Sequence, residues 1–450
     1  MGKYFGTDGF RGEANIDLTV EHAFKIGRFL GWYFGQLRPC RVVIGKDTRR
    51  SSYMLEDALS AGLTASGADV FLLHVTTTPS VSYITRTDSF DCGIMISASH
   101  NPYYDNGIKL INMNGEKMEE EVINEVEKYL DGHIEEVPYA KREYIGRTVD
   151  YVTGRNRYIG YLITLAQHSY KGMKVGLDCA NGSAWMIAKN IFETLGAETI
   201  VISNRPNGLN INERCGSIHI ERLQEIVREN HLDVGFAFDG DADRCLAVDN
   251  NGNVVDGDLI LYVYGTYMKE REKLNNNTIV TTIMSNLGLF KALDKADINY
   301  IKVPVGDKNV YDAMRNGGYV FGGEQSGHII FSKYASSSDG ILTAMKIMQV
   351  ILDKKMPLSK LIEPVLIYPQ VLKNAQVIDR DKALLDEDIK AAIQKVEEKL
   401  GDSGRLLVRK SGTEPLIRIM VEAPTNEECE ENVNLILDAL QQKNLLLEVK

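Results

Sequence analysis

The sequence predicts an α/β protein in which three related β-α-β domains and a smaller C-terminal α+β domain surround a central cleft. Three segments, beginning at Arg41, Lys174 and Thr278, share one order: a β-rich run, a polar loop, a helical stretch and a second β-rich run. Such units imply parallel strands and right-handed crossovers. After each unit comes another apolar run that ends in a polar loop, whereas the C-terminal residues break the pattern. We therefore expect domains over residues 1–152, 153–255, 256–366 and 367–450.

Local signals support each domain in turn. Helices are predicted at both ends of the first domain, over LTVEHAFKIGRFLGWYFG, capped by Thr19, and over KMEEEVINEVEKYLDG, ending at Gly132. KVGLDCANGSAWMIAKNIFETLGAETIVIS and TIVTTIMSNLGLFKALDKADINYIKVPV predict the strand–helix–strand cores of the second and third domains. In the last domain, RLLVRKSGTEPLIRIMVEA predicts strand–loop–strand, and Thr425 is the expected cap of a final helix.

Composition limits the classes of function. The chain has 450 residues, of which 44% are hydrophobic and 25% charged, as is typical of globular proteins. Its net charge of −11 argues against a nucleic-acid partner. The six cysteines lack metal-ligand spacing, and no apolar run approaches the ~18 residues of a membrane span. Because no signal-peptide pattern is present, we expect a cytoplasmic protein with free thiols and no membrane partner.

The segment DGDADR places Asp239, Asp241 and Asp243 at alternate positions after the apolar run LDVGFAF. Alternate residues of an extended chain point to one side, so the three carboxylates would repel unless a cation lay between them. Mg²⁺ prefers oxygen ligands of this kind. The alternative is a solvated acidic turn, but the buried strand before the loop favours a metal site. Arg244, the next residue, is expected to order the loop or to hold phosphate.

The segment SASHNP places Ser99 at the end of another apolar run. A serine hydroxyl can be the nucleophile of phosphoryl chemistry, and the alternative is a turn in which Ser and Asn cap backbone amides. A serine hydrolase is disfavoured, because the GxSxG elbow is absent and His100, as the next residue, is not expected to face the hydroxyl. Lys109 is a candidate acid, base or phosphate ligand, although a lone lysine is more often at the surface.

The segment GGEQSGH contains Glu324, Ser326 and His328. Their donors and acceptors suit the hydroxyls of a sugar, and His328 can also carry a proton. The alternative is a glycine-rich turn with a structural histidine.

The segment RKSGTEPLIR predicts a phosphate cradle, because guanidinium, hydroxyl and backbone donors occur together in it. Its candidate ligands are Arg409, Lys410, Ser411, Gly412, Thr413 and Arg418. Arg11 in GTDGFRG and Lys46 and Arg49 in GKDTRR are further basic candidates, for which simple exposure is the alternative.

In identity and order, the four loops resemble those of the α-D-phosphohexomutase superfamily, and the resemblance covers essentially the whole chain. ISASHNP resembles the phosphoserine loop, DGDADR the Mg²⁺ loop, GEQSGH the sugar-recognition loop and RKSGTEPLIR the phosphate-binding loop. The resemblance implies four domains, the last of the TATA-binding-protein-like type, a phosphosugar substrate and a homodimer.

Several segments are similar to the bacterial branch that interconverts glucosamine 6-phosphate and glucosamine 1-phosphate, on the route to UDP-N-acetylglucosamine and the cell wall. These are KYFGTDGFRG, SASHNPYYDNGIK, NGLNINERCGS and Gln325 within GEQSGH. Two segments depart from that branch: VGDK has Lys308 where arginine is usual, and SSSDG replaces TTGDG at residues 336–340. We expect both departures to lie away from the four loops and to affect only fine substrate contacts.

The resemblance also implies a mechanism. Phospho-Ser99 donates its phosphoryl group to a hydroxyl of the bound monophosphate, and the resulting hexosamine 1,6-bisphosphate, also the expected activator, returns its other phosphate. One Mg²⁺ per site is expected on Ser99 and the three aspartates. The residues implied are, for catalysis, Ser99, Lys109, His328 and Arg11; for substrate binding, Glu324, Ser326, His328, Arg409, Ser411, Gly412, Thr413 and Arg418; and in support, His100 and Arg244.

Three other functions stay open from the sequence. The first is a phosphomannomutase/phosphoglucomutase with the same chemistry on a different sugar. The second is a serine hydrolase that uses Ser99 and His100. The third is a non-catalytic sensor of sugar phosphates, which we would expect to have lost the serine or a carboxylate, whereas this chain retains all four.

Overall fold

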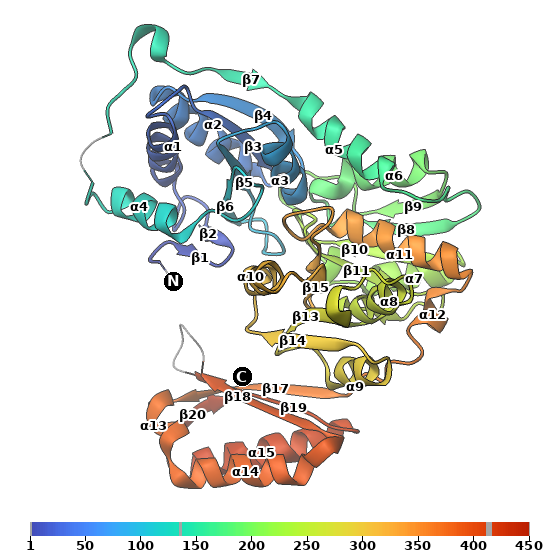
Figure 1. Ribbon diagram of the computed structural model, residues 1–450. Coiled ribbons are helices and arrows are strands. Elements are labelled where there is room, and N and C mark those ends of the chain that lie inside the picture. The colour runs from blue at the N-terminus through green and yellow to red at the C-terminus, as the bar shows by residue number, and fades with distance from the viewer. Residues whose placement is uncertain (1, 135–136, 411–415, 450) are drawn as a thin grey trace. The chain divides into compact units, whose positions relative to one another are not determined.

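The computed structural model describes residues 2–134, 137–410 and 416–449 (Figure 1). The chain forms two compact units. Unit 1 comprises Met1–Met284 and Asp297–Glu363, and unit 2 comprises Ser285–Ala296 and Pro364–Lys450. Within the described residues, unit 1 holds three sheets and unit 2 holds one.

The first sheet of unit 1 has seven strands in the order β1-β2-β6-β5-β3-β4-β7. Neighbours among β5, β3, β4 and β7 are parallel, whereas β6, β2 and β1 extend the sheet in antiparallel fashion. The strands are β1 (Phe5–Gly6), β2 (Gly9–Glu13), β3 (Arg41–Lys46), β4 (Asp69–Val75), β5 (Cys92–Ile96), β6 (Asp105–Asn112) and β7 (Thr148–Asp150). The helices are α1 (Val20–Phe34), α2 (Arg50–Ala65), α3 (Thr78–Thr87) and α4 (Glu120–Leu130).

Helices cover both faces of this sheet (Figure 1). Because successive strand residues point to opposite faces, Val42 and Ile44 join the core formed with α1 and α2, whereas Val43 joins the core formed with α3. All three side chains are fully buried. A strand covered on both faces reads as a continuous apolar run, which is why RVVIG shows no alternation.

The second and third sheets repeat the arrangement of the first. In each, the first strand of the repeat lies between the other two, with all three parallel: β3 between β5 and β4, β8 between β10 and β9, and β13 between β15 and β14. The next strand, β6, β11 or β16, then turns back antiparallel. The predicted threefold repetition is confirmed, and the three polar loops occupy equivalent places, where ligands gather in such sheets.

The elements of these two repeats have the following bounds. The second repeat contains α5 (Val152–Thr164), β8 (Lys174–Asp178), α6 (Ala188–Thr194), β9 (Glu198–Ile202), α7 (Glu221–Glu229), β10 (Val234–Phe238), β11 (Cys245–Val248) and β12 (Val254–Val255). The third contains α8 (Gly257–Glu270), β13 (Thr278–Thr282), β14 (Asn299–Val303), α10 (Asp307–Gly317), β15 (Phe321–Gly323), β16 (Ile329–Phe331), α11 (Gly340–Lys354) and α12 (Leu358–Leu361).

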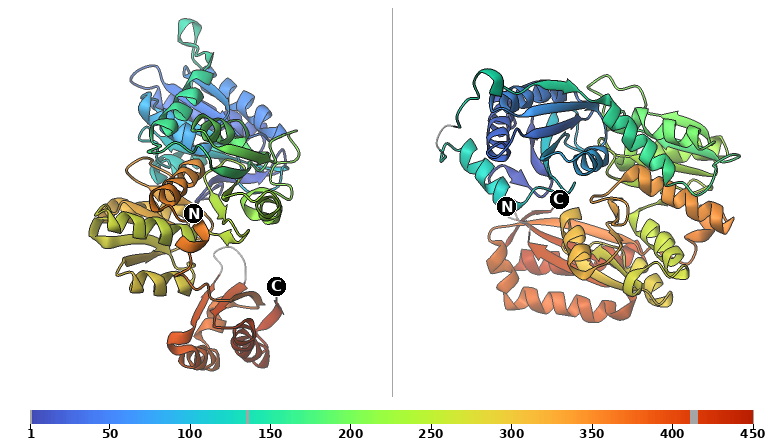
Figure 2. Two further views of the ribbon diagram at one scale, coloured as in Figure 1. Left: turned by 90° about the vertical axis from the view of Figure 1, so that its right-hand side faces the viewer. Right: turned by 45° about the horizontal axis from the view of Figure 1, so that its top comes forward.

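Unit 2 is an antiparallel sheet in the order β18-β19-β17-β20, with α14 and α15 side by side on one face (Figure 2). This confirms the predicted α+β domain. The unit also includes α9 of the third repeat, which Asn286 caps while Asn286 Nδ2 donates to the carbonyl oxygen of Tyr368 (2.9 Å). Its elements are α9 (Leu287–Lys295), β17 (Gln370–Val377), α13 (Arg380–Leu385), α14 (Glu387–Leu400), β18 (Arg405–Lys410), β19 (Leu416–Glu422), α15 (Asn426–Gln442) and β20 (Leu446–Val449).

The predicted caps are confirmed. Thr19 accepts a hydrogen bond from the amide of His22 at the start of α1, and Thr425 from that of Glu428 at the start of α15. All six cysteines are free, as expected, and the structure shows that they are also buried. No helix in the described part of the chain combines the length and the hydrophobicity needed to cross a bilayer. The four predicted domain bounds stay predictions.

Candidate active site

The loop after β5 presents Ser99 in an unusual backbone conformation. Ser99 is almost fully buried and has φ +52°, in the left-handed region. Its amide donates to Ser97 Oγ (2.9 Å) in the same loop. Its hydroxyl donates to Asp239 Oδ2 (2.5 Å), at the end of β10. The predicted nucleophile therefore directly contacts the predicted metal loop.

The shape of this loop is maintained by Arg49, whose side chain is fully buried and paired with Asp47. The Arg49 guanidinium donates to the carbonyl oxygens of Ser99 (3.2 Å) and Asn101 (2.6 Å). From the second repeat, Asn212 Nδ2 donates to the Ser99 carbonyl as well (2.9 Å). Exposure, the alternative considered for Arg49, is wrong: the residue is an internal support of the Ser99 loop.

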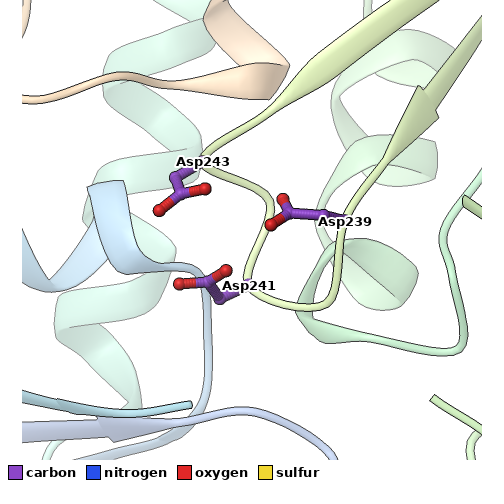
Figure 3. Close-up of side chains that lie close together, drawn as sticks. All are labelled: Asp239, Asp241 and Asp243. Carbon is purple, nitrogen blue, oxygen red and sulfur yellow. The ribbon is translucent and has the colours of Figure 1, made fainter. Parts of the chain in front are cut away.

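The loop after β10 brings three carboxylates together. Asp239, Asp241 and Asp243 are buried, and a ligand atom from each lies within 4.8 Å of the others. Figure 3 shows their carboxylates turned toward a common space. Asp241 Oδ1 is buried and has no hydrogen-bond partner within the described residues. Buried carboxylates in this number, one with an unsatisfied oxygen, fit a hard divalent cation that prefers oxygen ligands.

Electrostatics separates the three carboxylates. Burial, together with the charges of Asp243 and Asp241, raises the pKa of Asp239 to about 7. Burial also opposes ionisation of Asp243, but Lys109 and His328 outweigh it and hold the Asp243 pKa well below its usual range. Lys109 Nζ lies 2.5 Å from Asp241 Oδ2 and 3.0 Å from Asp243 Oδ2, so that its own pKa rises in spite of burial. Lys109 is therefore an internal cation of the site and not a surface lysine.

The loop after β15 adds His328, which lies between two carboxylates. Its Nδ1 is 3.0 Å from Glu324 Oε2, and its Nε2 is 3.1 Å from Asp243 Oδ1. Burial and Arg244 oppose protonation, but the carboxylates outweigh them and raise the pKa of His328 to about 10. The ring is therefore an imidazolium at neutral pH. Ser326, in the same loop, is exposed.

Arg244 connects the metal loop with the sugar loop. Its amide donates to Asp239 Oδ1 (3.1 Å), and its Nε lies 3.1 Å from His328 Nε2. Beside it, the amide of Cys245 donates to the carbonyl oxygen of Gly327 (3.0 Å). The backbone of Arg244 thus links the two loops, because it also forms an isolated antiparallel bridge with His328. The role of the Arg244 side chain stays a prediction.

The side chains that depart from the resembled branch bond outside the four loops: Lys308 pairs with Glu120 and Asp312. Ser336 bonds Arg86 and the carbonyl oxygen of Asn114. The two segments do reach the loops, but through glycines that the branch shares. In the segment VGDK, the amide of Gly306 donates to Glu324 Oε1 (2.9 Å). In SSSDG, the amide of Gly340 donates to the carbonyl oxygen of Ala242 (3.0 Å). The contacts are made by backbone amides, which explains why other side chains are compatible with them.

A cavity of about 400 Å³ adjoins these loops and is lined by Lys109, Asp243 and the polar N-terminal loop. Lys117 also lines this cavity, and its Nζ donates to Asp8 Oδ1 (3.1 Å) and Asp307 Oδ1 (2.6 Å). Arg11 is partly buried and lies 3.4 Å from Asp8. The cavity is large enough for a monosaccharide phosphate.

Unit 2, described by itself, contains two facing arginines. Arg409 and Arg418 are directly paired across β18 and β19. Burial and the charge of Arg418 lower the pKa of Arg409, and Arg418 Nε is buried without a partner in the described ranges. Two close guanidiniums, with no ion pair to a carboxylate among the described residues, suit an anion. Lys410 instead pairs with Asp381 (2.7 Å). Ser411, Gly412 and Thr413 lie outside the described residues.

Comparison with known proteins decides the family. The chain matches all four phosphoglucomutase/phosphomannomutase domain models: domain I over residues 2–136, domain II over 156–252, domain III over 256–367 and the C-terminal domain over 372–439. It is 64% identical to phosphoglucosamine mutase of Lachnospira eligens, over 98% of this chain and 99% of that protein. The chain belongs to the phosphoglucosamine mutase family. The family member of Brevibacillus brevis is 48% identical, over 98% of this chain and all of that protein.

Solved structures support the fold. A phosphoglucomutase/phosphomannomutase family protein of Burkholderia thailandensis superposes with a TM-score of 0.80 at 22% identity, covering 99% of this chain and 100% of that one. Aspergillus fumigatus N-acetylphosphoglucosamine mutase, solved with GlcNAc-6P and magnesium, gives 0.69 at 18% identity, covering 98% and 96%. The fold of this phosphoglucosamine mutase family member is therefore that of the phosphohexomutases.

One expectation about the Ser99 loop is wrong. His100 Nδ1 lies 3.3 Å from Ser99 Oγ, next to the left-handed backbone of Ser99. Burial and Arg244 lower the pKa of His100 to about 4, so the ring is neutral. No carboxylate hydrogen-bonds this ring within the described residues, whereas a hydrolase triad requires a third group that orients the base. The contact therefore does not revive the hydrolase hypothesis.

Proposed function

We propose that the protein interconverts glucosamine 6-phosphate and glucosamine 1-phosphate through phospho-Ser99 and a bound hexosamine 1,6-bisphosphate. The observation that carries the proposal is the contact of Ser99 Oγ with Asp239 Oδ2, which joins a nucleophile to a buried carboxylate cluster. The 64% identity to a phosphoglucosamine mutase over nearly the whole chain supports the choice of sugar.

In the first half of the reaction, the O–P bond of phospho-Ser99 breaks while a bond forms between phosphorus and a hydroxyl oxygen of the sugar. The proton of that hydroxyl leaves, and Ser99 Oγ gains one. In the second half, the other phosphate of the bisphosphate returns to Ser99. We assign the proton transfers to Lys109 and His328. Both are cations in the structure, so one of them would give its proton to the departing Ser99 oxygen, and the group left neutral would take up the proton that the attacking hydroxyl releases.

The remaining assignments follow from donor chemistry. Glu324 and Ser326 would bind sugar hydroxyls, Arg11 the phosphate on Ser99, and Arg409 and Arg418 the phosphate that does not react. Mg²⁺ held by Asp239, Asp241, Asp243 and phospho-Ser99 would neutralise the charge on the transferring group, which is the main demand of phosphoryl transfer. The magnesium in the solved fungal N-acetylphosphoglucosamine mutase supports this choice of ion. Cytoplasmic location and a homodimer stay predictions.

The test is phosphorus-31 NMR with Mg²⁺, a trace of hexosamine 1,6-bisphosphate, and either glucosamine 6-phosphate or glucose 6-phosphate. We expect the glucosamine 1-phosphate signal to grow much faster than that of glucose 1-phosphate. Ser99→Ala should lower turnover at least ~1,000-fold. Ser80→Ala is the matched control, because Ser80 Oγ is buried and has no hydrogen-bond partner in the described part of the chain. Faster conversion of glucose phosphate would reject the amino sugar, and near-normal turnover of Ser99→Ala would reject the phosphoserine mechanism.

A further inference from the structure

We propose that Thr78 is a positioning residue for the metal loop: it fixes the Asp241 carboxylate so that Oδ1 faces the other two aspartates. The inference rests on the proposed function, because it presupposes that the three aspartates bind a divalent cation. Thr78 belongs to the first repeat and Asp241 to the second, 163 residues away. The contact therefore ties the repeat that carries Ser99 to the loop that binds the cation.

Thr78 reaches Asp241 with two donors. It is the first residue of α3 and is 8% exposed. The amide of a first helical residue has no partner inside its own helix, and here it donates to the carbonyl oxygen of Asp241 (3.0 Å). The Thr78 hydroxyl donates to Asp241 Oδ2. One donor thus fixes the backbone of the loop, and the other fixes the side chain.

The consequence lies in the other carboxylate oxygen. Lys109 Nζ also contacts Asp241 Oδ2 (2.5 Å), so that this oxygen has two donors. Asp241 Oδ1 is buried and has none among the described residues. A buried oxygen without a donor is unfavourable unless something else binds it. In Figure 3 the Asp241 carboxylate faces those of Asp239 and Asp243, where a cation would satisfy the free oxygen.

Groups that orient a metal ligand usually change metal affinity when they are removed, by about 10- to 100-fold. A hydroxyl that only stabilised the fold would change the melting temperature without changing the affinity for the ion. Thr78 is one of the residues that line the cavity described above, but both of its hydrogen-bond donors are used by Asp241, so its removal should act on metal binding first and on turnover through it.

The experiment measures Mn²⁺ binding to the unphosphorylated full-length protein by electron paramagnetic resonance. Thr78→Val keeps the shape of the side chain but removes the donor, and we expect its Kd for Mn²⁺ to rise about 10- to 100-fold. Thr78→Ser retains the hydroxyl and should stay within about threefold of the wild type. Thr76→Val is the control, because Thr76 is fully buried two residues away and its hydroxyl has no partner within the described residues.

Melting in EDTA accompanies each titration, and Thr78→Ala replaces Thr78→Val if the valine variant does not fold. The proposal is overturned if the valine or alanine variant binds Mn²⁺ as tightly as the wild type, or if Thr76→Val weakens binding equally. Those outcomes leave the mutase function intact, provided that the wild type converts glucosamine 6-phosphate. Conversely, a wild type that binds Mn²⁺ but converts no hexosamine phosphate would reject the proposed function and not the role of Thr78.

Discussion

Lys109 and Lys346 are both withdrawn from water, yet their pKa values move in opposite directions. Burial lowers the pKa of either ammonium. At Lys109, Asp241 and Asp243 reverse the effect and raise the pKa. At Lys346, on α11, burial and the charges of Lys333 and Lys273 lower the pKa to about 8. The contacts of Lys346 are the ring of Tyr334 (4.0 Å) and Gln349 Oε1 (3.5 Å), with no carboxylate ion pair among the described residues. The partner, and not the burial, decides in which direction the pKa of a buried lysine moves.

Removal of the paired lysine should have the largest effect. Lys109→Met leaves Asp241 as a buried anion without its cation and leaves Asp243 with His328 alone, which is strongly unfavourable. We expect turnover to fall at least ~100-fold and melting in EDTA to fall by about 5–10 °C. Mg²⁺ should raise the melting temperature of the variant more than that of the wild type, because added positive charge replaces the lost ammonium. An equal response to Mg²⁺ in both proteins would contradict this account of Lys109.

Removal of the unpaired lysine should have the opposite sign. The pKa of Lys346 is about 8 in the folded protein, compared with an ordinary value of 10.5. Protonation of this residue therefore favours the unfolded chain and lowers the stability of the folded protein. Lys346→Met should therefore stabilise the protein at pH 7 by ~1–3 kcal/mol. The advantage should be full below pH 8, shrink as pH rises and vanish above 10.5.

Thermal unfolding at several pH values checks the sign of this effect. The control is Lys354→Met on the same helix, where Lys354 pairs with Glu270 near the surface and should contribute less than ~1 kcal/mol. A Lys346→Met variant that is less stable than the wild type at pH 7 would refute the argument.

The smallest effect is expected at a lysine near the surface. Lys308 is one-third exposed and pairs with Glu120 (2.7 Å) and Asp312 (3.7 Å). Such pairs contribute little, so Lys308→Arg should change KM for glucosamine 6-phosphate less than about threefold. Steady-state kinetics at two salt concentrations would test this. A larger change would show that the side chain of Lys308 itself binds the substrate.

The sequence predicted what depends on local order. The three repeats could be predicted because β-rich and helical segments recur in the same order with polar loops between them. The site loops could be predicted because each follows the end of an apolar run. The contacts that stabilise the loops could not be predicted, because the partners are distant in the sequence. Arg49 is 50 residues from Ser99, and Asn212, which also donates to Ser99, is 113 residues from it. Arg49 and Lys46 were candidate phosphate ligands with simple exposure as the alternative, because burial of a cation can be inferred only when its partner is known; Lys46 is in fact buried against Glu56. The position of His100 was predicted wrongly, because nothing in the segment SASHNP indicates that Ser99 has a left-handed backbone conformation.

That left-handed backbone has a consequence for how the protein can evolve. Ser99 at φ +52° and Ala242 at φ +56° occupy conformations that glycine adopts more easily. At Ser99, glycine would relieve the backbone and remove the nucleophile in one step. Selection for a more robust fold and selection for turnover therefore pull in opposite directions at this position. A lineage released from the need to catalyse would be expected to change there early, and to gain stability as it lost the reaction.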